Sequence, residues 1–220
     1  MPLLENKIIA IENVWLSYTD KNILEDINLD IYQGDFLLIT GPNGGGKTSL
    51  LRTILRLQSP TKGRISFFRQ GEPVSSLDMG YLPQKNSIDS RFPITVEEVV
   101  ASGLMGNTQK GNTKFDSKKE IDEMLDLMGI TALRNKPIGV LSGGQLQRSL
   151  FGRALISKPE MLILDEPASY IDRQFGNRMF EILRDLSSNG TTIMMVSHEI
   201  EPFIALSNRN RYINHILGDR

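Results

Sequence analysis

The stretch Gly41-Pro42-Asn43-Gly44-Gly45-Gly46-Lys47-Thr48 decides the fold of this chain, and it directly follows the apolar run Phe36-Leu37-Leu38-Ile39. It matches the pattern G-x-x-x-x-G-K-[ST], in which glycines allow successive backbone N–H groups to surround phosphate oxygens at the start of a helix. In this pattern the lysine brings a positive charge to the β- and γ-phosphates, and the final hydroxyl is offered to Mg²⁺. We therefore predict a buried strand, a phosphate-binding loop and a helix, with Gly41 to Ser49 as the nucleotide-binding residues.

The composition limits the kinds of protein that the chain can be. Its 220 residues fit one α/β domain that buries a substantial core. Its 25 basic and 26 acidic residues nearly balance, so we expect no nucleic-acid partner held by broad electrostatic attraction. The absence of cysteine excludes disulfides, thiolate metal sites and thiol catalysis. No apolar run approaches the roughly 18 residues that span a bilayer, so we expect a soluble chain that meets a membrane only through a partner.

Short apolar segments on both sides of the loop predict alternating strands and helices. Alternating and β-branched residues predict antiparallel strands near the N-terminus, at 8–18 and 27–31. Continuous apolar runs predict buried parallel strands at 35–40, 161–164 and 192–196. Helices are expected after Thr48, at 145–157 and at 173–187, short strands at 64–68 and 80–82, and a loop at 70–76. From Arg209 onward we find only a weak alternation.

The middle of the chain has a different pattern, of amphipathic helices and polar loops. Thr95-Val96-Glu97-Glu98 forms a capping box, which opens a helix that we expect to run through Leu104. Ser117-Lys118-Lys119-Glu120 opens a second predicted helix, and Gly129 ends it. Residues 106–116 between the two helices are expected to form a loop.

Two carboxylates end the predicted strand Met161-Leu162-Ile163-Leu164-Asp165-Glu166. Because adjacent strand residues point to opposite sides, we expect different tasks for them, provided that strand geometry continues through Glu166. Asp165 suits the ligand shell of Mg²⁺ and Glu166 suits the attacking water, a division that phosphoryl transfer needs. Alternatively, the two acids only begin a turn before Pro167.

The stretch Leu141-Ser142-Gly143-Gly144-Gln145 discriminates best among functions. Ser142 and Gln145 form a capping box around two glycines, so the helix would begin with bare backbone N–H groups that a phosphate can approach. An ordinary capped helix is the alternative.

Three stretches in this order and at this separation resemble one family. Gly41 to Thr48, Leu141 to Gln145 and Leu162 to Glu166 are similar to motifs of the ATPase subunits of ATP-binding cassette (ABC) transporters. The resemblance covers nearly the whole chain. It implies an α/β fold, with a P-loop NTPase core, an N-terminal antiparallel β layer and an inserted α-helical subdomain. We accordingly predict a single domain of residues 1–220, in which 1–83 and 141–220 form the nucleotide-binding core and 84–140 the helical subdomain. The resemblance also implies an ATPase with ATP and Mg²⁺ as cofactors, the Mg²⁺ being held by Thr48, Gln84 and Asp165.

Further family positions can be matched one residue at a time. Tyr18 lies 29 residues before Lys47, where the family has an aromatic residue that stacks on adenine; packing in the β layer is its alternative role, and Trp15 is the competing aromatic. The resemblance implies that Gln84 senses Mg²⁺ and the attacking water and that His198 contacts the γ-phosphate. The predicted catalytic residues are Glu166, His198 and Gln84, whereas His215 is expected to be structural.

The resemblance further implies a head-to-tail dimer, in which the signature residues of one copy close on the nucleotide of the other. These residues are Ser142, Gly143, Gly144 and Gln145, and Asp172 lies in the loop that touches the opposite subunit. Two departures from the family pattern occur. Tyr170 replaces a usually small residue, so the contact of that loop is expected to pack differently. Gly45 replaces a small side chain and is expected to add flexibility without removing a phosphate ligand.

Likeness in the segment from Tyr81 to Val96 points to the importer ATPases for manganese, zinc and iron-type cargo. The implied partners are a second copy of the chain, integral membrane permease subunits and a substrate-binding receptor, with no nucleic acid. The implied location is the cytoplasmic face of the cell membrane, peripheral and through the permease. Two alternatives stay open: an ATPase for another importer cargo, such as an iron chelate or cobalamin, and a soluble ABC ATPase, such as an iron–sulfur assembly factor.

Overall fold

The computed structural model describes residues 6–18, 21–84, 92–105, 114–197, 201–214 and 216–219. The chain divides into two compact units, Met1–Leu77 with Phe180–Arg220, and Asp78–Met179. These limits differ from those of the predicted helical subdomain, 84–140, which stay a prediction. The strands and helices of both units confirm the predicted α/β class.

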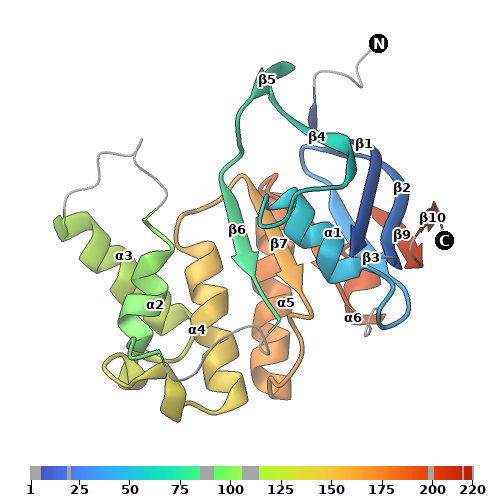
Figure 1. Cartoon of the computed structure of the whole chain (residues 1–220). Coiled ribbons are helices and arrows are strands. Elements are labelled where there is room, and N and C mark those ends of the chain that lie inside the picture. Colours follow the sequence, from blue (N-terminus) through green and yellow to red (C-terminus); the bar gives the residue numbers. More distant parts are fainter. Residues whose placement is uncertain are drawn as a thin grey trace. The chain divides into compact units, whose positions relative to one another are not determined.

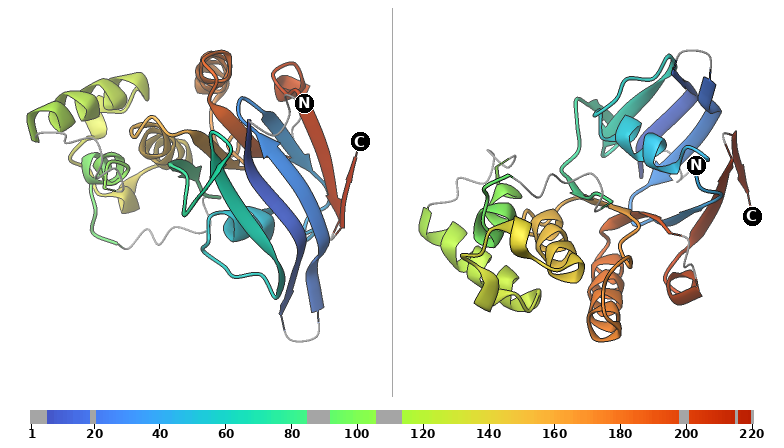
Figure 2. Two further views of the ribbon diagram at one scale, coloured as in Figure 1. Left: turned by 90° about the horizontal axis from the view of Figure 1, so that it is seen from above. Right: turned by 60° about the horizontal axis from the view of Figure 1, so that its bottom comes forward.

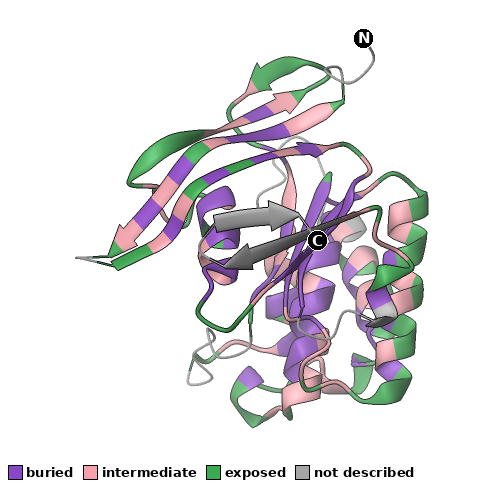
Figure 3. Ribbon diagram, turned by 90° about the vertical axis from the view of Figure 1, so that its right-hand side faces the viewer, coloured by how far each residue is buried: buried purple, intermediate pink, exposed green. Residues whose placement is uncertain are grey.

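An antiparallel sheet forms the N-terminal part of the first unit (Figure 1). Its strand order is β2-β1-β4-β5, with β1 at Lys7–Tyr18, β2 at Lys21–Tyr32, β4 at Lys62–Arg69 and β5 at Glu72–Val74. Along β2 the buried residues Leu24, Ile27, Leu29 and Ile31 are separated by more exposed ones, and Figure 3 shows this alternation along the antiparallel strands. The predicted loop at 70–76 is wrong in part, because β5 pairs with β4 through Val74 and Phe67.

The strand that leads into the phosphate-binding loop lies between two parallel strands of the first unit. β3 (Phe36–Thr40) lies between β8 (Thr192–Val196) and β9 (Arg209–Asn214), and it is parallel to both. Every residue of β3 and β8 is buried, as their continuous apolar sequences predict. The helices that begin in this unit are α1 (Lys47–Ile54) and α6 (Glu201–Ile204).

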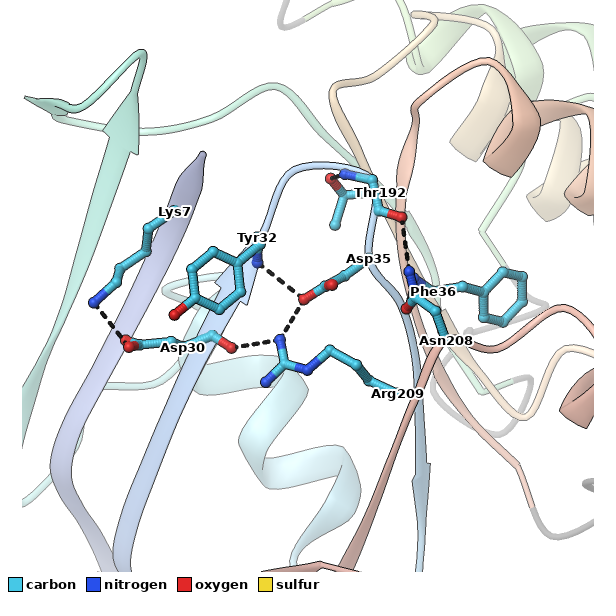
Figure 4. A network of polar contacts seen from close by, with 9 residues as sticks. Lys7, Asp30, Tyr32, Asp35, Phe36, Thr192, Asn208 and Arg209 are labelled. Carbon is cyan, nitrogen blue, oxygen red and sulfur yellow. Dashed lines mark hydrogen bonds and ion pairs between the residues drawn. The ribbon is translucent and has the colours of Figure 1, made fainter. Parts of the chain in front are cut away.

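The C-terminal segment forms a hairpin that its weak alternation did not predict. β9 pairs antiparallel with β10 (Ile216–Asp219), and β9 also completes the hydrogen bonding along one side of β3. A polar network joins this hairpin to the β2–β3 turn (Figure 4). Arg209 pairs with the carboxylate of Asp35 and donates to the carbonyl oxygen of Asp30 at 2.8 Å. Because Asp35 also accepts from the N–H of Tyr32 at 3.0 Å, residues far apart in sequence define the entry to β3.

The second unit combines two parallel strands with a group of helices. β6 (Met79–Leu82) pairs with β7 (Met161–Asp165). The helices are α2 (Val96–Ser102), α3 (Lys114–Leu127) and α4 (Gly143–Leu155), with 3₁₀ turns at Thr131–Leu133 and Ile138–Val140. α5 (Arg173–Ser188) begins in this unit and continues into the first. Figure 2 shows α2, α3 and α4 side by side.

Close backbone approaches position α4 at the centre of this group. A Cβ atom on Gly80 would lie 2.0 Å from the carbonyl oxygen of Ala154, and one on Gly103 would lie 2.1 Å from that of Arg153. Only glycine therefore allows β6 and the end of α2 to pack this closely on α4.

The helix limits correct the sequence predictions in several places. The capping box at Thr95 is confirmed by the 3.3 Å hydrogen bond from the N–H of Glu98 to the Thr95 hydroxyl, but α2 ends at Ser102 instead of Leu104. α3 begins at Lys114, so residues 114–116 of the predicted loop are helical, and residues 106–113 lie outside the described part. Helix ends are decided by tertiary packing as much as by capping residues, which explains such shifts of about one turn.

Candidate active site

The phosphate-binding loop connects β3 to α1 with a backbone that favours glycine. Gly41, Gly44 and Gly46 have φ angles of 143°, 76° and 94°. A Cβ atom on Gly46 would also lie 2.6 Å from the carbonyl oxygen of Ile23. Gly46 therefore needs to be glycine for two independent reasons, whereas a Cβ atom on Gly44 would meet nothing within 4 Å.

Lys47 lies across this loop with its side chain largely buried. It is 7% exposed, and its Nζ donates to the carbonyl oxygens of Gly41 and Pro42, at 2.8 Å each. The N–H of Gly45 donates to the Pro42 carbonyl oxygen at 3.1 Å. The loop thus holds a positive charge beside the beginning of α1, where the first backbone N–H groups of a helix lack intrahelical partners. Such an arrangement attracts anions.

The two candidate aromatic residues for adenine stacking differ in their surroundings. Tyr18 ends β1 and is 53% exposed. Trp15 is only half-buried, but the Nζ of Lys62 lies 5.8 Å from its ring centroid and its carbonyl oxygen accepts from the N–H of Thr61 at 2.8 Å. Tyr18 therefore has the more accessible ring, and its adenine contact stays a prediction.

Asp165 and Glu166 occupy the end of β7, and their backbones differ. Asp165 is the last strand residue and is fully buried. Glu166 is half-buried and has a φ of 53°, a left-handed conformation that is unusual for a residue with a side chain. Strand geometry, the condition for the expected division of tasks, therefore does not continue through Glu166. The chain turns there, as in the alternative interpretation, with the N–H of Ser169 donating to the Glu166 carbonyl oxygen at 3.2 Å. The two carboxylates are separated by this turn and not by strand alternation.

The predicted capping box at the start of α4 is confirmed. The N–H of Gln145 donates to the Ser142 hydroxyl at 3.3 Å, and the N–H of Ser142 donates to Oε1 of Gln145 at 3.0 Å. The helix begins at Gly143, earlier than the predicted Gln145. A cavity of about 540 Å³ opens beside it, lined by Gly129, Ile130, Leu133, Ser142, Gly143, Gly144, Gln145, Arg148, Tyr170 and Asp172.

Asp172 connects the start of α5 to α4. Its carboxylate accepts from the N–H of Phe175 at 2.9 Å and forms an ion pair with Arg148. These interactions, the backbone hydrogen bond first, hold the pKa of Asp172 below its ordinary value of 3.8. The guanidinium carbon of Arg148 also lies 4.5 Å from the ring centroid of Phe175. Arg148 was missed by the sequence interpretation, because its partner lies 24 residues away along the chain.

The structure brings together some of the predicted site residues within each unit. Gly41 to Ser49 form one group in the first unit, and Ser142 to Gln145 share a cavity with Asp172 in the second. Gln84 follows β6 and is exposed. His198 and His215 lie outside the described residues. The geometry between the loop of Lys47 and the acids of the second unit stays a prediction.

These observations define a class of protein. A buried strand, a glycine loop with a buried lysine and a following helix, accompanied by a second buried strand that ends in a carboxylate, are the features of an α/β nucleotide-binding protein of the P-loop class. Within the described residues no helix is long and apolar enough to cross a membrane.

Comparison with known proteins identifies the family. The model of the ABC transporter family matches residues 24–169, and the chain belongs to this family. A Chlamydia pneumoniae protein named "Probable metal transport system ATP-binding protein" is 40% identical over 89% of this chain and 81% of its own. The zinc uptake system ATP-binding protein ZurA of Listeria innocua is 37% identical over 97% of this chain and 82% of its own. An ATP-binding cassette solved as a dimer in a post-hydrolysis state with ADP and Pi shares the fold, with a TM-score of 0.83 and 24% identity over 96% of this chain and 98% of that chain. The chain is therefore an ATP-binding ABC ATPase.

Proposed function

We propose that this chain is the ATP-hydrolysing subunit of a membrane importer for metal ions of the zinc, manganese or iron type. The observation that carries the proposal is the similarity to two relatives named for metal transport and zinc uptake, which extends over 89% and 97% of the chain. It agrees with the resemblance that the segment from Tyr81 to Val96 suggests in the sequence. ATP hydrolysis is thus assigned to energy coupling for that import.

Nucleotide binding is assigned to the first unit. The N–H groups of the loop and of the first turn of α1 are proposed to bind the phosphates, and Lys47 to move from the carbonyl oxygens of Gly41 and Pro42 to the β- and γ-phosphates. Tyr18 is proposed to stack on adenine.

Hydrolysis is assigned to Thr48 on α1 and to groups at or after the ends of strands. The hydroxyl of Thr48 and the buried carboxylate of Asp165 are hard oxygen donors of the kind that Mg²⁺ prefers, and Gln84 is proposed to join them. Bound Mg²⁺ would neutralise charge that develops on the phosphates. Glu166 is proposed to orient the attacking water and accept its proton, and His198 to contact the γ-phosphate.

A second copy of the chain is proposed to complete each site. The glycines at 143 and 144 and the confirmed capping box leave bare N–H groups at the start of α4, which suits the γ-phosphate of a nucleotide bound to another copy. Asp172 is proposed to lie in the contact between copies. ATP would then favour the closed dimer and hydrolysis the open one, a shift between two populations.

The remaining partners are proposed from membership of the ABC transporter family. Integral permease subunits would hold the chain at the cytoplasmic face of the membrane, and a substrate-binding receptor would deliver the cargo. Movement of the helices around α4 would be transmitted to the permease.

The experiment disrupts the gene and restores it with wild-type, Lys47→Ala or Lys118→Ala chains. Cellular zinc, manganese and iron are measured under metal limitation. We expect one of the three metals to fall on disruption and with Lys47→Ala, and to recover with wild type and with the exposed-lysine control Lys118→Ala. Unchanged content of all three metals would reject metal import, while ATP hydrolysis by the purified chain tests the enzyme separately.

A further inference from the structure

The first two turns of α4 approach the loop that follows Glu166 closely at one point and bind it at two. A Cβ atom on Gly144 would lie 2.9 Å from the carbonyl oxygen of Tyr170. Nε2 of Gln147 donates to the carbonyl oxygen of Pro167 at 3.2 Å. Arg148 pairs with Asp172. One helix therefore contacts this loop near both of its ends, at the residue after Glu166 and at the start of α5.

Gln147 is an unusual residue at its position. It is 1% exposed on a helix whose neighbouring buried residues are mostly apolar, such as Leu146 and Leu150. Its amide nitrogen, and not its amide oxygen, faces the Pro167 carbonyl oxygen, because only the N–H group can donate a hydrogen bond to a carbonyl oxygen. Its Oε1 is buried and accepts no hydrogen bond from any described residue. A buried amide with one unused acceptor costs stability that an apolar side chain would not, so the hydrogen bond to Pro167 needs an explanation beyond packing.

The position of Pro167 supplies that explanation. Pro167 directly follows Glu166, whose φ of 53° is a conformation that the surroundings have to maintain. A hydrogen bond to the Pro167 carbonyl oxygen restrains the peptide unit that follows this left-handed turn. The direction of the Glu166 side chain depends on the same backbone.

We infer that Gln147 is a positioning residue for Glu166, acting through the Pro167 carbonyl oxygen. This inference rests on the proposed role of Glu166 in hydrolysis. Because Gln147 lies one turn after the glycines that are proposed to contact the partner's nucleotide, the same hydrogen bond joins two half-sites of one chain. The approach of α4 to the partner's nucleotide is thereby linked to the alignment of the chain's own carboxylate.

The first test replaces Gln147 by methionine, which keeps the length of the side chain and removes the donor. Leu150→Met is the matched control, since Leu150 is 2% exposed on the same helix and has no part in the site. We expect kcat for ATP hydrolysis to fall about tenfold in Gln147→Met, a part of what a well-placed general base contributes. The Kd for ATP should be unchanged, because the phosphate loop lies in the other unit. The control should keep both constants. Gln147→Glu, which also presents an oxygen to Pro167, is a second variant with the same expectation.

The second test separates an effect on Glu166 from an effect on the start of α4. Mixed dimers are prepared in which one chain carries Glu166→Gln, so that a single working carboxylate remains. The reference is the mixed dimer that has no change at Gln147. We expect slower hydrolysis than this reference when Gln147→Met lies on the chain with the intact Glu166, and the same rate as the reference when it lies on the other chain. A residue that only supports the helix start would give the opposite result.

The outcomes distinguish this inference from the proposed function. Wild-type turnover in Gln147→Met, weaker ATP binding in proportion to the loss of kcat, or the reversed pattern in mixed dimers would each overturn the positioning role. If Glu166→Gln in both chains hydrolyses ATP normally, the proposed role of Glu166 itself is wrong, whatever the Gln147 variants do.

Discussion

Replacement of Gly46 by alanine tests the structural reading of the phosphate-binding loop. Gly46 has a φ of 94°, and an added Cβ atom would lie 2.6 Å from the Ile23 carbonyl oxygen and 2.8 Å from Cδ2 of Leu24. A left-handed conformation costs a residue with a Cβ roughly 1–2 kcal/mol. Forcing an extra carbon into a packed region adds about 1–3 kcal/mol, and more where the obstacle is backbone. The free energy of unfolding should therefore fall by roughly 2–5 kcal/mol.

Gly34 provides a matched control for this estimate. It has a φ of 79°, and a Cβ atom there would meet nothing within 4 Å. Gly34→Ala should cost only the conformational energy of the left-handed backbone, because the site is open, and Gly34 lies away from the nucleotide. Both alanine variants lower the entropy of the unfolded chain by the same amount, so this effect cancels between them. The difference between these two variants isolates the clash. For a chain of this length the clash corresponds to a melting temperature lower by about 2–12 °C.

The assay combines thermal unfolding with titration of ATP. Gly46→Ala should melt below Gly34→Ala and bind ATP at least about tenfold more weakly, because the loop has to shift away from Ile23. Gly34→Ala should bind ATP normally. If Gly46→Ala matches Gly34→Ala in both melting temperature and affinity, the close approach to β2 does not constrain the loop and the reasoning is refuted.

Three other substitutions test separate parts of the site. Glu166→Gln should bind ATP with unchanged affinity and hydrolyse it about 10²- to 10⁴-fold more slowly, with an ATP-trapped dimer seen by gel filtration; normal turnover would reject Glu166 as the base. Ser142→Arg should retain ATP binding but lose ATP-dependent dimerisation, since a cation and its bulk would occupy the start of α4; undiminished dimerisation counts against a shared site. Asp172→Asn should be less stable than wild type at pH 7. The pKa of Asp172 is lowered in the folded chain, so its carboxylate stabilises the fold above the ordinary pKa of 3.8, and this stabilisation is lost as the pH falls through the lowered pKa. The difference in unfolding free energy between wild type and Asp172→Asn should therefore disappear on acidification. A difference that does not change with pH would contradict the ion pair with Arg148.

Local sequence predicted the elements whose signals are local. The glycine loop, the buried strands β3, β7 and β8, and the capping boxes at Thr95 and Ser142 each depend on residues within a few positions of one another. The hairpin of β9 and β10 was missed because its stability depends on pairing with β3, about 170 residues earlier in the chain. Pro167 offered a local signal for a turn after Asp165, but it did not predict the left-handed backbone of Glu166, which surrounding contacts maintain.

The sequence by itself determined the class of this protein, the order of its motifs and the identity of its chemical groups, because phosphate binding needs particular residues at short spacing. Tertiary structure decided which groups act on one another. It left Tyr18 exposed at the end of β1, paired Arg148 with Asp172 and placed the amide of Gln147 on the carbonyl oxygen of Pro167, beside Glu166. Such contacts join segments that are 20 or more residues apart, and their geometry follows from how α4 packs and not from any pattern within it.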